Sequence, residues 1–575
     1  MTDVYEFSKS SRAQTRNDYS PYVDKQYNGY VNDLNSGVYT NNSLSLVQFD
    51  LGQIYNSQKY TDTNDLFLVI PITLVAAFSA TNTPVAPVNG NHALLSLKTN
   101  FVNLIHQVDL QVNGKTVEST QPFINVAKNF QMMSEMSLND QKTIGYTLGF
   151  SEELDNPRSV KWNASTTANG NGFTNNIPFA VAADKCSTRT QSVIATTQNS
   201  KCTNNAIQSK IARCADVSQT GYNNIYGTIL TSTQLNNEFR PTYQVLNTNY
   251  MVWYDYAVVK LSTVLESLEN IGLVKRFDSS IRFWINTGTI NVAVVNPNAT
   301  TLQYSLTTAN NTFSATCPFI VNYLNETSAN GGIPTTTTNV VAGCYIRSPP
   351  TTSFAGINLA TSGASHPMPA CRIYYSQIQL DPVKSLQYLE KSRNKNVVFR
   401  NILSNQFSGI GAGNTFNQLV NAGITHPTGI LIMPYIGSTT TNGLGDFQWK
   451  SPFDSCPATS SPCSLTNLQV SVGGVNMLQS TLYYNYEHFI EQINLAEQLT
   501  SSDFGVSVGL FNQLYWETFK SYYVNIERSA VADKLQPRNI NISFVNNTNV
   551  PIDILVFIFY SDEFQIDCET GIITK

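Results

Sequence analysis

Hydrophobic and polar residues alternate over several stretches of the chain, and this period of two predicts β-strands with one buried face. The clearest unit spans residues 101–133. Its alternating face is formed by Val102, Leu104, His106, Val108, Leu110 and Val112. Asn113-Gly114 predicts the tight turn of a hairpin, because both residues tolerate positive φ. After Pro122 the apolar period changes to three and four, which predicts a short helix over residues 123–133.

The same order of strand, glycine turn and helix returns late in the chain. Residues 467–472 alternate, Gly473-Gly474 predicts the turn, and residues 486–493 carry a helical apolar stripe. A gapless overlay that pairs Asn125 with Asn485 gives few identities, so the likeness lies in the periods rather than in the letters. This pattern suggests a duplicated architecture.

Further alternating or continuous apolar runs predict strands in both halves of the chain. They cover residues 44–51, 66–78, 250–259, 281–285, 290–294, 540–544 and 552–560. Residues 261–273 predict another short helix. We expect each half to end in a hairpin of two long strands. Many short strands separated by turns predict an all-β fold of two tandem sandwiches, and the eight-stranded jelly roll is one such sandwich.

Polar segments without a sustained period separate these strands. Residues 1–40 are rich in Tyr, Asn and Ser and predict an extended N-terminal arm that orders against a partner. Residues 151–240 are too long for a bare loop and predict an elaborated insertion. We expect a first jelly roll over residues 41–300 that contains this insertion, a connecting segment and loop over 301–368, and a second jelly roll over 369–575.

Size and composition limit the classes of protein that fit this pattern. The 575 residues are too many for one core, so two or three domains are expected. Only 13% of the residues are charged, which suits a surface covered by neighbouring subunits. A net charge of −5 argues against a chain that binds nucleic acid through its overall charge. The longest apolar runs are shorter than a membrane span, and the N-terminus lacks the pattern of a secretory signal.

No pattern in the sequence predicts catalysis. Residues 505–509 match the Gly-x-Ser-x-Gly turn of hydrolases, but that fold needs its histidine after the serine, and the last histidine is His488. The glycine-rich residues 409–413 lack the Gly-Lys-Ser ending of a phosphate-binding loop. His106 lies on an apolar strand face, which favours a core residue over a ligand. We therefore expect no enzyme activity and no cofactor.

The cysteines and acidic residues do not predict a metal site. The nine cysteines include no Cys-x-x-Cys pair, and the acidic residues near the C-terminus do not form a calcium-binding loop. Free thiols are our default interpretation. The alternative is a local disulfide between Cys456 and Cys463, which lie together in a Ser- and Pro-rich loop.

Three stretches near the expected start of the second jelly roll point to a particular family. They are Cys371-Arg372-Ile373-Tyr374-Tyr375, Ile378-Gln379-Leu380-Asp381-Pro382 and Lys395-Asn396-Val397-Val398-Phe399. Residues 522–528, 540–546 and 564–571 follow them, and residues 261–286 fit in the first half. The order of these stretches resembles that of double jelly-roll major capsid proteins, most closely those of virophages and Polinton-like viruses.

The resemblance implies a function in virus assembly. It implies two tandem eight-stranded jelly rolls with short helices and long loop insertions. It also implies a homotrimer that forms a pseudo-hexameric capsomer in an icosahedral shell around double-stranded DNA. Neighbouring capsomers, penton proteins and minor capsid proteins would be partners, in virions assembled inside the host cell. The alternative is a secreted or displayed carbohydrate-binding β-sandwich, such as a lectin or adhesin.

Two sets of residues are candidates for contacts in such a shell. Aromatic residues of the arm would clamp neighbouring capsomers, and they are Tyr5, Phe7, Tyr19, Tyr22, Tyr27 and Tyr30. A local basic run is formed by Lys391, Arg393, Lys395 and Arg400. This run is either a solvated face or a non-specific contact with packaged DNA or an acidic neighbour, and a DNA contact would depend steeply on salt.

Overall fold

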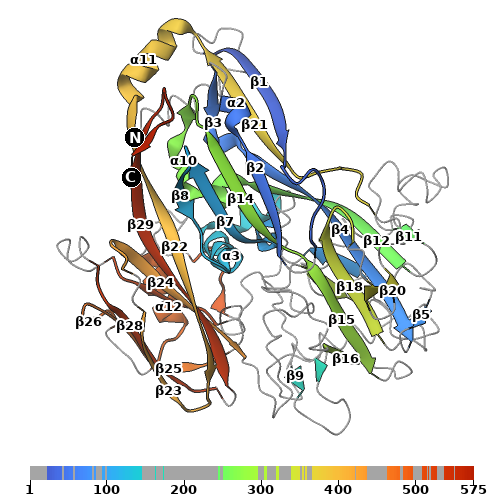
Figure 1. Cartoon of the computed structure of the whole chain (residues 1–575). Coiled ribbons are helices and arrows are strands. Elements are labelled where there is room, and N and C mark those ends of the chain that lie inside the picture. Colours follow the sequence, from blue (N-terminus) through green and yellow to red (C-terminus); the bar gives the residue numbers. More distant parts are fainter. Residues whose placement is uncertain are drawn as a thin grey trace.

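The structure is a computed structural model of the chain. It describes residues 23–41, 44–55, 59–80, 83–85, 94–97, 100–144, 162–163, 172–173, 244–246, 250–295, 303–306, 319–322, 339–349, 353–354, 357–358, 365–420, 423–436, 463–478, 483–495, 508–513, 516, 520–527, 537–548 and 551–574. The described part of the chain is dominated by β-strands that form two sandwiches (Figure 1). None of its helices is long and apolar enough to cross a membrane.

The second sandwich consists of a five-stranded sheet and a four-stranded sheet, and the fifth strand of the larger sheet is β30 (Ile573–Thr574), which pairs with β29. One sheet has the order β22-β29-β24-β27 and the other has the order β23-β28-β25-β26. Their bounds are β22 (Asn394–Ile410), β23 (Thr415–Val420), β24 (Pro427–Ile436), β25 (Leu465–Val472), β26 (Val475–Asn476), β27 (Tyr522–Asn525), β28 (Ile540–Asn546) and β29 (Ile552–Asp567). Numbered along the chain, the strands pair in the orders 1-8-3-6 and 2-7-4-5. This arrangement is a jelly roll, in which successive strands cross between the two sheets except for the fourth and fifth, which pair within one sheet.

The first sandwich repeats the same strand order. Its sheets are β1-β21-β4-β12 and β2-β14-β7-β8. Their bounds are β1 (Val23–Asn32), β2 (Leu44–Asp50), β4 (Phe67–Ala80), β7 (Ile105–Val112), β8 (Lys115–Ser119), β12 (Tyr250–Lys260), β14 (Ser279–Asn286) and β21 (Arg372–Leu380). These strands again pair as 1-8-3-6 and 2-7-4-5, so the predicted all-β fold of two tandem jelly rolls is confirmed.

Helices occupy equivalent places in the two sandwiches. α3 (Ile124–Glu135) and α4 (Leu138–Ile144) follow the fifth strand of the first sandwich, and α9 (Leu261–Val264) and α10 (Glu266–Ile271) follow its sixth strand. α12 (Tyr486–Asn494) follows the fifth strand of the second sandwich. The helix predicted over residues 123–133 is therefore confirmed as α3. α11 (Pro382–Ser392) links the sandwiches, and the carboxylate of Asp381 caps it by accepting from two backbone N–H groups.

The first sandwich carries a sheet extension that has no counterpart among the described residues of the second. Between β14 and β21 the chain adds β15 (Gly288–Val295), β16 (Gln303–Leu306) and β18 (Asn339–Ile346) to the far part of β4. Figure 1 shows these strands running away from the sandwich beside β4 and β12. The predicted insertion at residues 151–240 lies outside the described residues, apart from β9 (Trp162–Asn163) and β10 (Gly172–Phe173).

Shorter elements complete the description. They are α2 (Gly52–Tyr55), β3 (Tyr60–Asp62), β5 (Thr83–Val85), β6 (Leu94–Leu97), β11 (Gln244–Leu246), β13 (Leu273–Val274), β17 (Phe319–Asn322), β19 (Ser353–Phe354), β20 (Ile357–Asn358), β30 (Ile573–Thr574) and the 3₁₀ turns at Thr63–Asp65 and Phe101–Leu104. The second of these turns occupies the start of the strand that we predicted from residue 102.

The strand pairings cross the boundaries that we expected. β1 lies in the segment predicted as an arm, yet it pairs with β21 over its whole length. β21 lies where the second jelly roll was expected to begin, but its partners β1 and β4 belong to the first sandwich. The predicted hairpins at the end of each half are wrong. β14 and β15 lie in different sheets, and so do β28 and β29, because a jelly roll crosses between its sheets at these points.

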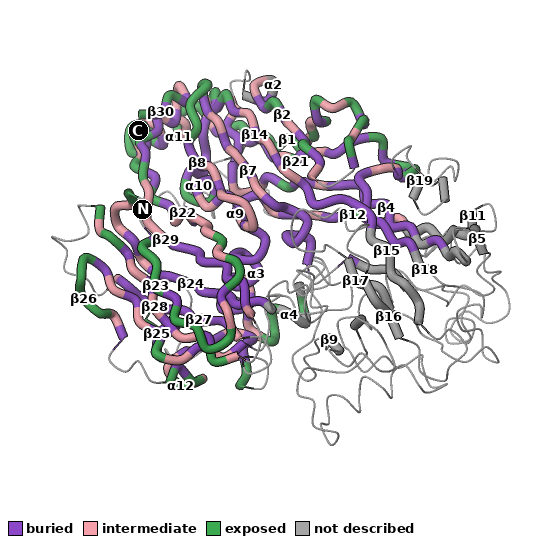
Figure 2. The backbone as a smooth tube through the Cα atoms, turned by 60° about the horizontal axis from the view of Figure 1, so that its bottom comes forward, coloured by how far each residue is buried: buried purple, intermediate pink, exposed green. Residues whose placement is uncertain are grey.

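Each sandwich has a core between its two sheets. In the first, Phe49 packs edge-on against Phe283, with ring centroids 6.0 Å apart. In the second, Phe416 stacks on Phe544 at 4.8 Å. The buried residues run without interruption from one core to the other (Figure 2). The two sandwiches are therefore joined by a buried interface, which we call the junction.

Candidate functional site

The junction forms where α3 and α10 of the first sandwich pack against the sheet β22-β29-β24-β27. Phe130 of α3 stacks on Tyr523 of β27, with ring centroids 6.1 Å apart and an interplanar angle of 21°. The neighbouring Tyr522 points the other way, into the second sandwich, where its hydroxyl donates to Cys463 O at 3.0 Å. Tyr523 therefore lies on the outer face of this sheet, and the first sandwich covers that face.

Other outer-face residues of this sheet are equally buried. Leu431 and Phe557 are register neighbours of Tyr523 across β24 and β29, so the three side chains share one face. All three are 2% exposed or less. An apolar sheet face is thus removed from water by contact between the two sandwiches rather than by the core of either one.

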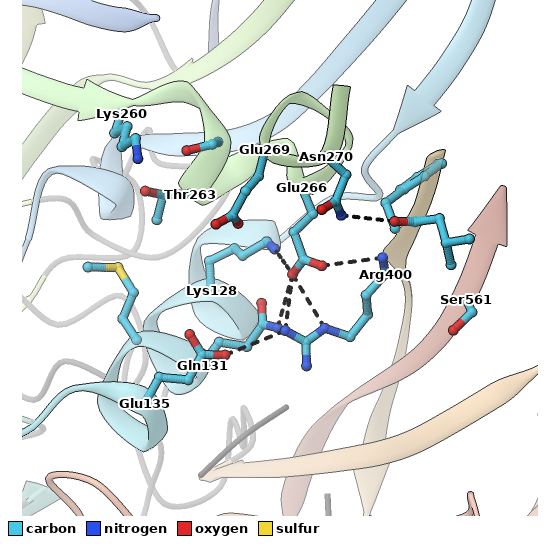
Figure 3. Close-up of a pocket in the computed structure, with 14 residues that line it drawn as sticks. Lys128, Gln131, Glu135, Lys260, Thr263, Glu266, Glu269, Asn270, Arg400 and Ser561 are labelled. Atoms are coloured by element: carbon cyan, nitrogen blue, oxygen red, sulfur yellow. Dashed lines mark hydrogen bonds and ion pairs between the residues drawn. The ribbon is translucent and has the colours of Figure 1, made fainter. Parts of the chain in front are cut away.

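Charged residues from both sandwiches meet in the junction (Figure 3). Glu266 of α10 accepts from Lys128 of α3 at 2.9 Å and from Arg400 of β22 at 3.2 Å. Arg400 also lies 3.5 Å from Glu135 of α3. Burial raises the pKa of Glu266, but the attraction of Lys128 and Arg400 outweighs this effect and brings the pKa to about 2. The glutamate is therefore ionised and links a strand of one sandwich to two helices of the other.

Glu118 of β8 is a second buried carboxyl beside this cluster. It accepts hydrogen bonds from the backbone N–H groups of Glu266 and Ser267, at 3.2 and 3.1 Å, and from the Ser267 hydroxyl. Glu118 thereby caps α10 from a different element. Burial raises the pKa of Glu118 to about 7, although the hydrogen bond from Ser267 and the charge of Lys128 oppose the shift.

A cavity of about 550 Å³ opens beside the ion pairs. Its lining is polar and mixes both signs of charge, because Lys260, Glu269 and Gln131 face it together with the ion-paired residues. In the described ranges, no group of three or more histidine, cysteine, aspartate or glutamate side chains is placed to hold a metal ion. The paired charges favour a structural contact over acid–base chemistry.

Further hydrogen bonds extend the junction to α11 and to the C-terminal end of the chain. Lys275 N–H donates to Cys568 O at 2.9 Å, and Tyr388 O–H donates to Leu273 O at 2.7 Å. Gly571 has a φ of 71°, and a Cβ there would lie 2.2 Å from Arg276 O. This position therefore requires glycine, both for its left-handed backbone and for the close approach of the two sandwiches.

The corresponding outer face of the first sandwich is exposed. Tyr30, Tyr374 and Phe67 are register neighbours across β1, β21 and β4, and they are 49%, 38% and 37% exposed. Tyr256 of β12 lies on the same face and is 46% exposed. The Arg372 guanidinium lies 4.3 Å from the centre of the Tyr30 ring. We call this surface the aromatic face, and Tyr30, Phe67 and Tyr374 line a groove of about 540 Å³ on it.

The residues predicted as arm contacts fall into two groups. Tyr5, Phe7, Tyr19 and Tyr22 lie outside the described residues. Tyr27 and Tyr30 belong to β1, and the Lys59 ammonium lies 3.3 Å from the centre of the Tyr27 ring. Of these two described residues, Tyr30 lies on the aromatic face beside Tyr374.

The predicted basic run does not form one surface. Lys391 is exposed in the last turn of α11, and Arg393 is ion-paired with Asp567 and Glu569 at 3.7 and 3.5 Å. Lys395 donates to Ile271 O at 2.9 Å, and Arg400 is held by Glu266. Lys395 and Arg400 thus contribute to the junction.

The remaining candidates have structural roles where the structure describes them. Of residues 505–509, Val508 and Gly509 are described, and a Cβ on Gly509 would lie 2.2 Å from Met133 O at the end of α3. His106 is buried against Phe123, and burial lowers its pKa to about 4.

Cys463 is buried, and its predicted partner Cys456 lies outside the described residues, so the disulfide stays a prediction.

Sequence reasoning missed the junction residues Lys128, Glu266 and Glu118. They lie on different helices and strands, and their separations in sequence follow no motif. The position of Lys128 next to the apolar stripe of the predicted helix at 123–133 was a local signal, because a lysine that is buried there, as it is in the structure, is rarely without a charged partner.

Comparisons with known proteins give no match among family models or curated proteins. Solved structures do match over most of the chain. The cryo-EM structure of the Sputnik virophage is 9% identical, with 96% of this chain and 89% of that chain covered and a TM-score of 0.43. The mavirus major capsid protein is 9% identical, with 95% and 89% covered and a TM-score of 0.41. The Faustovirus major capsid protein is 9% identical, with 95% and 91% covered and a TM-score of 0.40.

Proposed function

We propose that this chain is a viral major capsid protein, a structural subunit that assembles with copies of itself into the shell of a virion. The observation that supports this most directly is the presence of two jelly rolls with the same strand order on one chain, held together by a buried junction. A chain of this kind supplies two similar building blocks in a fixed relative position. The resemblance of residues 371–382 and 395–399 to double jelly-roll capsid proteins supports the same function.

In this proposal three copies form a ring of six similar sandwiches. Closed rings arise when a head-to-tail contact is repeated with the correct rotation. Such pseudo-hexameric trimers would tile an icosahedral shell around double-stranded DNA, in contact with neighbouring capsomers, penton proteins and minor capsid proteins. The first building block would extend through β21, and the second would begin after α11.

We propose a role without catalysis. The charged groups gathered in the junction are ion-paired or accept backbone hydrogen bonds, so their arrangement serves to hold the sandwiches together. Lys391 and Arg393 remain candidates for a non-specific contact with packaged DNA. The N-terminal aromatic residues remain candidates for clamping neighbouring capsomers.

The test is the assembly state of the purified full-length chain. Light scattering after gel filtration should give a mass about three times the 63.6 kDa of one chain. Negative-stain electron microscopy should show particles with three-fold symmetry and a hexagonal outline. A protein that remains monomeric at all concentrations, and forms neither rings nor shells, would contradict the proposal.

A further inference from the structure

We propose that residues 17–22 of this chain bind across α11, the helix that links the two sandwiches, and cover its exposed apolar side. The segment then acts as a strap that leads directly into β1 of the same molecule. This inference concerns a single chain, so it goes beyond the proposed function and does not depend on it.

The helix α11 has one side that is held by the sandwiches and one side that is open to water. Tyr388 is buried, and its ring packs edge-on against Tyr60 with ring centroids 5.5 Å apart. Ser385, one turn earlier on the same side, hydrogen-bonds to the Tyr60 hydroxyl at 2.9 Å. Val383 and Leu386 lie on the opposite side of the helix and are 61% and 70% exposed. We call these two residues the linker ridge.

The N-terminal segment enters β1 at the place where α11 begins. Val23, the first residue of β1, is paired with Leu380, and Asp381 caps α11 immediately afterwards. Because β1 and β21 are antiparallel, the chain that precedes Val23 continues in the direction in which β21 leads into α11. Figure 1 shows α11 beyond this end of the sheet. The residues just before β1 therefore start beside the linker ridge.

The length and composition of the segment fit the helix. α11 has 11 residues and spans about 16 Å. An extended chain covers this distance in about five residues, so residues 17–22 are long enough to cross it. Pro21 favours extended backbone, through its own fixed φ and through its restriction of Ser20. Tyr19 and Tyr22 bring two aromatic rings to the linker ridge, and their hydroxyl groups can stay in water.

The small size of the linker ridge favours a tethered segment over a separate partner. Two exposed side chains offer far less than the roughly 1,000 Å² that a stable interface between two proteins buries. A segment that is tethered a few residues away has a local concentration on the order of millimolar, so a weak contact is enough to hold it. The strap therefore shields the ridge from chance association between copies. Tyr5 and Phe7 lie farther from β1 and remain candidates for contacts with neighbouring copies.

A photo-cross-linking amino acid at position 386 of the full-length protein tests the contact directly. After irradiation, the product on a denaturing gel should keep the 63.6 kDa mass of one chain, and peptide mapping should show a link to residues 17–22. The same amino acid at position 419, where Leu419 is 56% exposed on β23, is the matched control and should not capture this segment. A link to a second chain, a link to other residues, or no link at position 386 would overturn the inference.

Limited proteolysis gives a second readout without a cross-linker. Leu386→Glu should speed chymotrypsin cleavage after Tyr19 by about threefold or more, because proteolysis follows the fraction of the segment that is open. Leu419→Glu is the control and should leave this rate unchanged. Both positions are exposed, so both variants should keep the unfolding temperature of the wild type. Equal cleavage rates in Leu386→Glu and the wild type would overturn the inference, whereas the capsid proposal is tested separately by the mass of the assembled protein.

Discussion

Glu266 is ionised in the junction because it forms ion pairs with Lys128 of the first sandwich and with Arg400 of the second. Glu266→Gln would leave Lys128 without its carboxylate and Arg400 with only the more distant Glu135, and breaking a buried pair in this way costs about 3 kcal/mol. Urea unfolding followed by tryptophan fluorescence should show this loss. Glu269→Gln, in the same cavity but at an exposed position, should change the free energy of unfolding by less than about 0.5 kcal/mol. Equal effects of the two substitutions would argue against the buried ion pair.

Glu118 gives the molecule a stability that depends on pH. The pKa of Glu118 is about 7 in the folded chain, against 4.5 for an unperturbed glutamate as in the unfolded chain. Between these pH values the carboxyl group is protonated in the folded chain and ionised in the unfolded chain. The contribution of Glu118 to stability is therefore present below pH 4.5 and is lost as the pH rises to 7. The difference in unfolding free energy between wild type and Glu118→Gln should fall over this range by an amount on the order of 3 kcal/mol.

The Glu118→Gln variant is itself the control for this measurement, because glutamine does not titrate and all other titrating groups are the same in both proteins. Both proteins are unfolded in urea at several pH values between 4 and 8, and only the difference between them is used, so that other titrating groups cancel. A difference that stays constant over the range would contradict the raised pKa of Glu118.

At the scale of elements, the turn between β29 and β30 is held against the first sandwich by a close backbone approach. Gly571→Ala would place a Cβ 2.2 Å from Arg276 O, in addition to the cost of a φ of 71°. Gly114→Ala is the matched control, since its φ is 74° but nothing lies within 4 Å of the added Cβ. The control should lose about 1 kcal/mol of unfolding free energy from the backbone alone.

Gly571→Ala should lose several kcal/mol, because backbone atoms must shift before the methyl group fits. Thermal unfolding of the two variants against the wild type measures both effects. Similar losses in the two variants would show that the turn does not need this close approach.

The local pattern of the sequence predicted elements better than it predicted their partners. Alternation indicated β7, β25 and β28, because the burial of one face is recorded in the sequence of each strand, and a continuous apolar run indicated β29. The partners of β21 are β1, β3 and β4, hundreds of positions earlier in the chain, and no local pattern records such a pairing. We expected the second jelly roll to begin at residue 369 because β21 is close in sequence to the strands that form the second sandwich.

The site was less predictable than the fold for a related reason. Lys128, Glu266 and Arg400 lie in three separate elements, and their chemistry becomes visible only when the two sandwiches are in contact. The predicted basic run contained Arg400 and Lys395, but their neighbours in sequence suggested a surface, whereas tertiary packing places both in the junction. Contacts between distant segments decide these roles.

For the whole molecule, the junction makes the two sandwiches depend on one another. Leu431, Tyr523 and Phe557 are removed from water by the first sandwich, so separation would expose a large apolar surface on the second. The full-length chain should therefore unfold in one cooperative transition, with a calorimetric enthalpy close to the van't Hoff value measured on the same sample. Two well-resolved transitions would show that the sandwiches are independent.

A fragment of residues 381–575 sharpens this test. With the outer face of its sheet uncovered, it should bind a hydrophobic dye or associate, and it should unfold at a lower urea concentration than the full chain. Replacing Tyr523, Phe557 and Leu431 by polar residues of similar size should improve the solubility of the fragment but destabilise the full-length protein. These opposite effects follow only if the same face is open in the fragment and buried in the junction of the full-length chain.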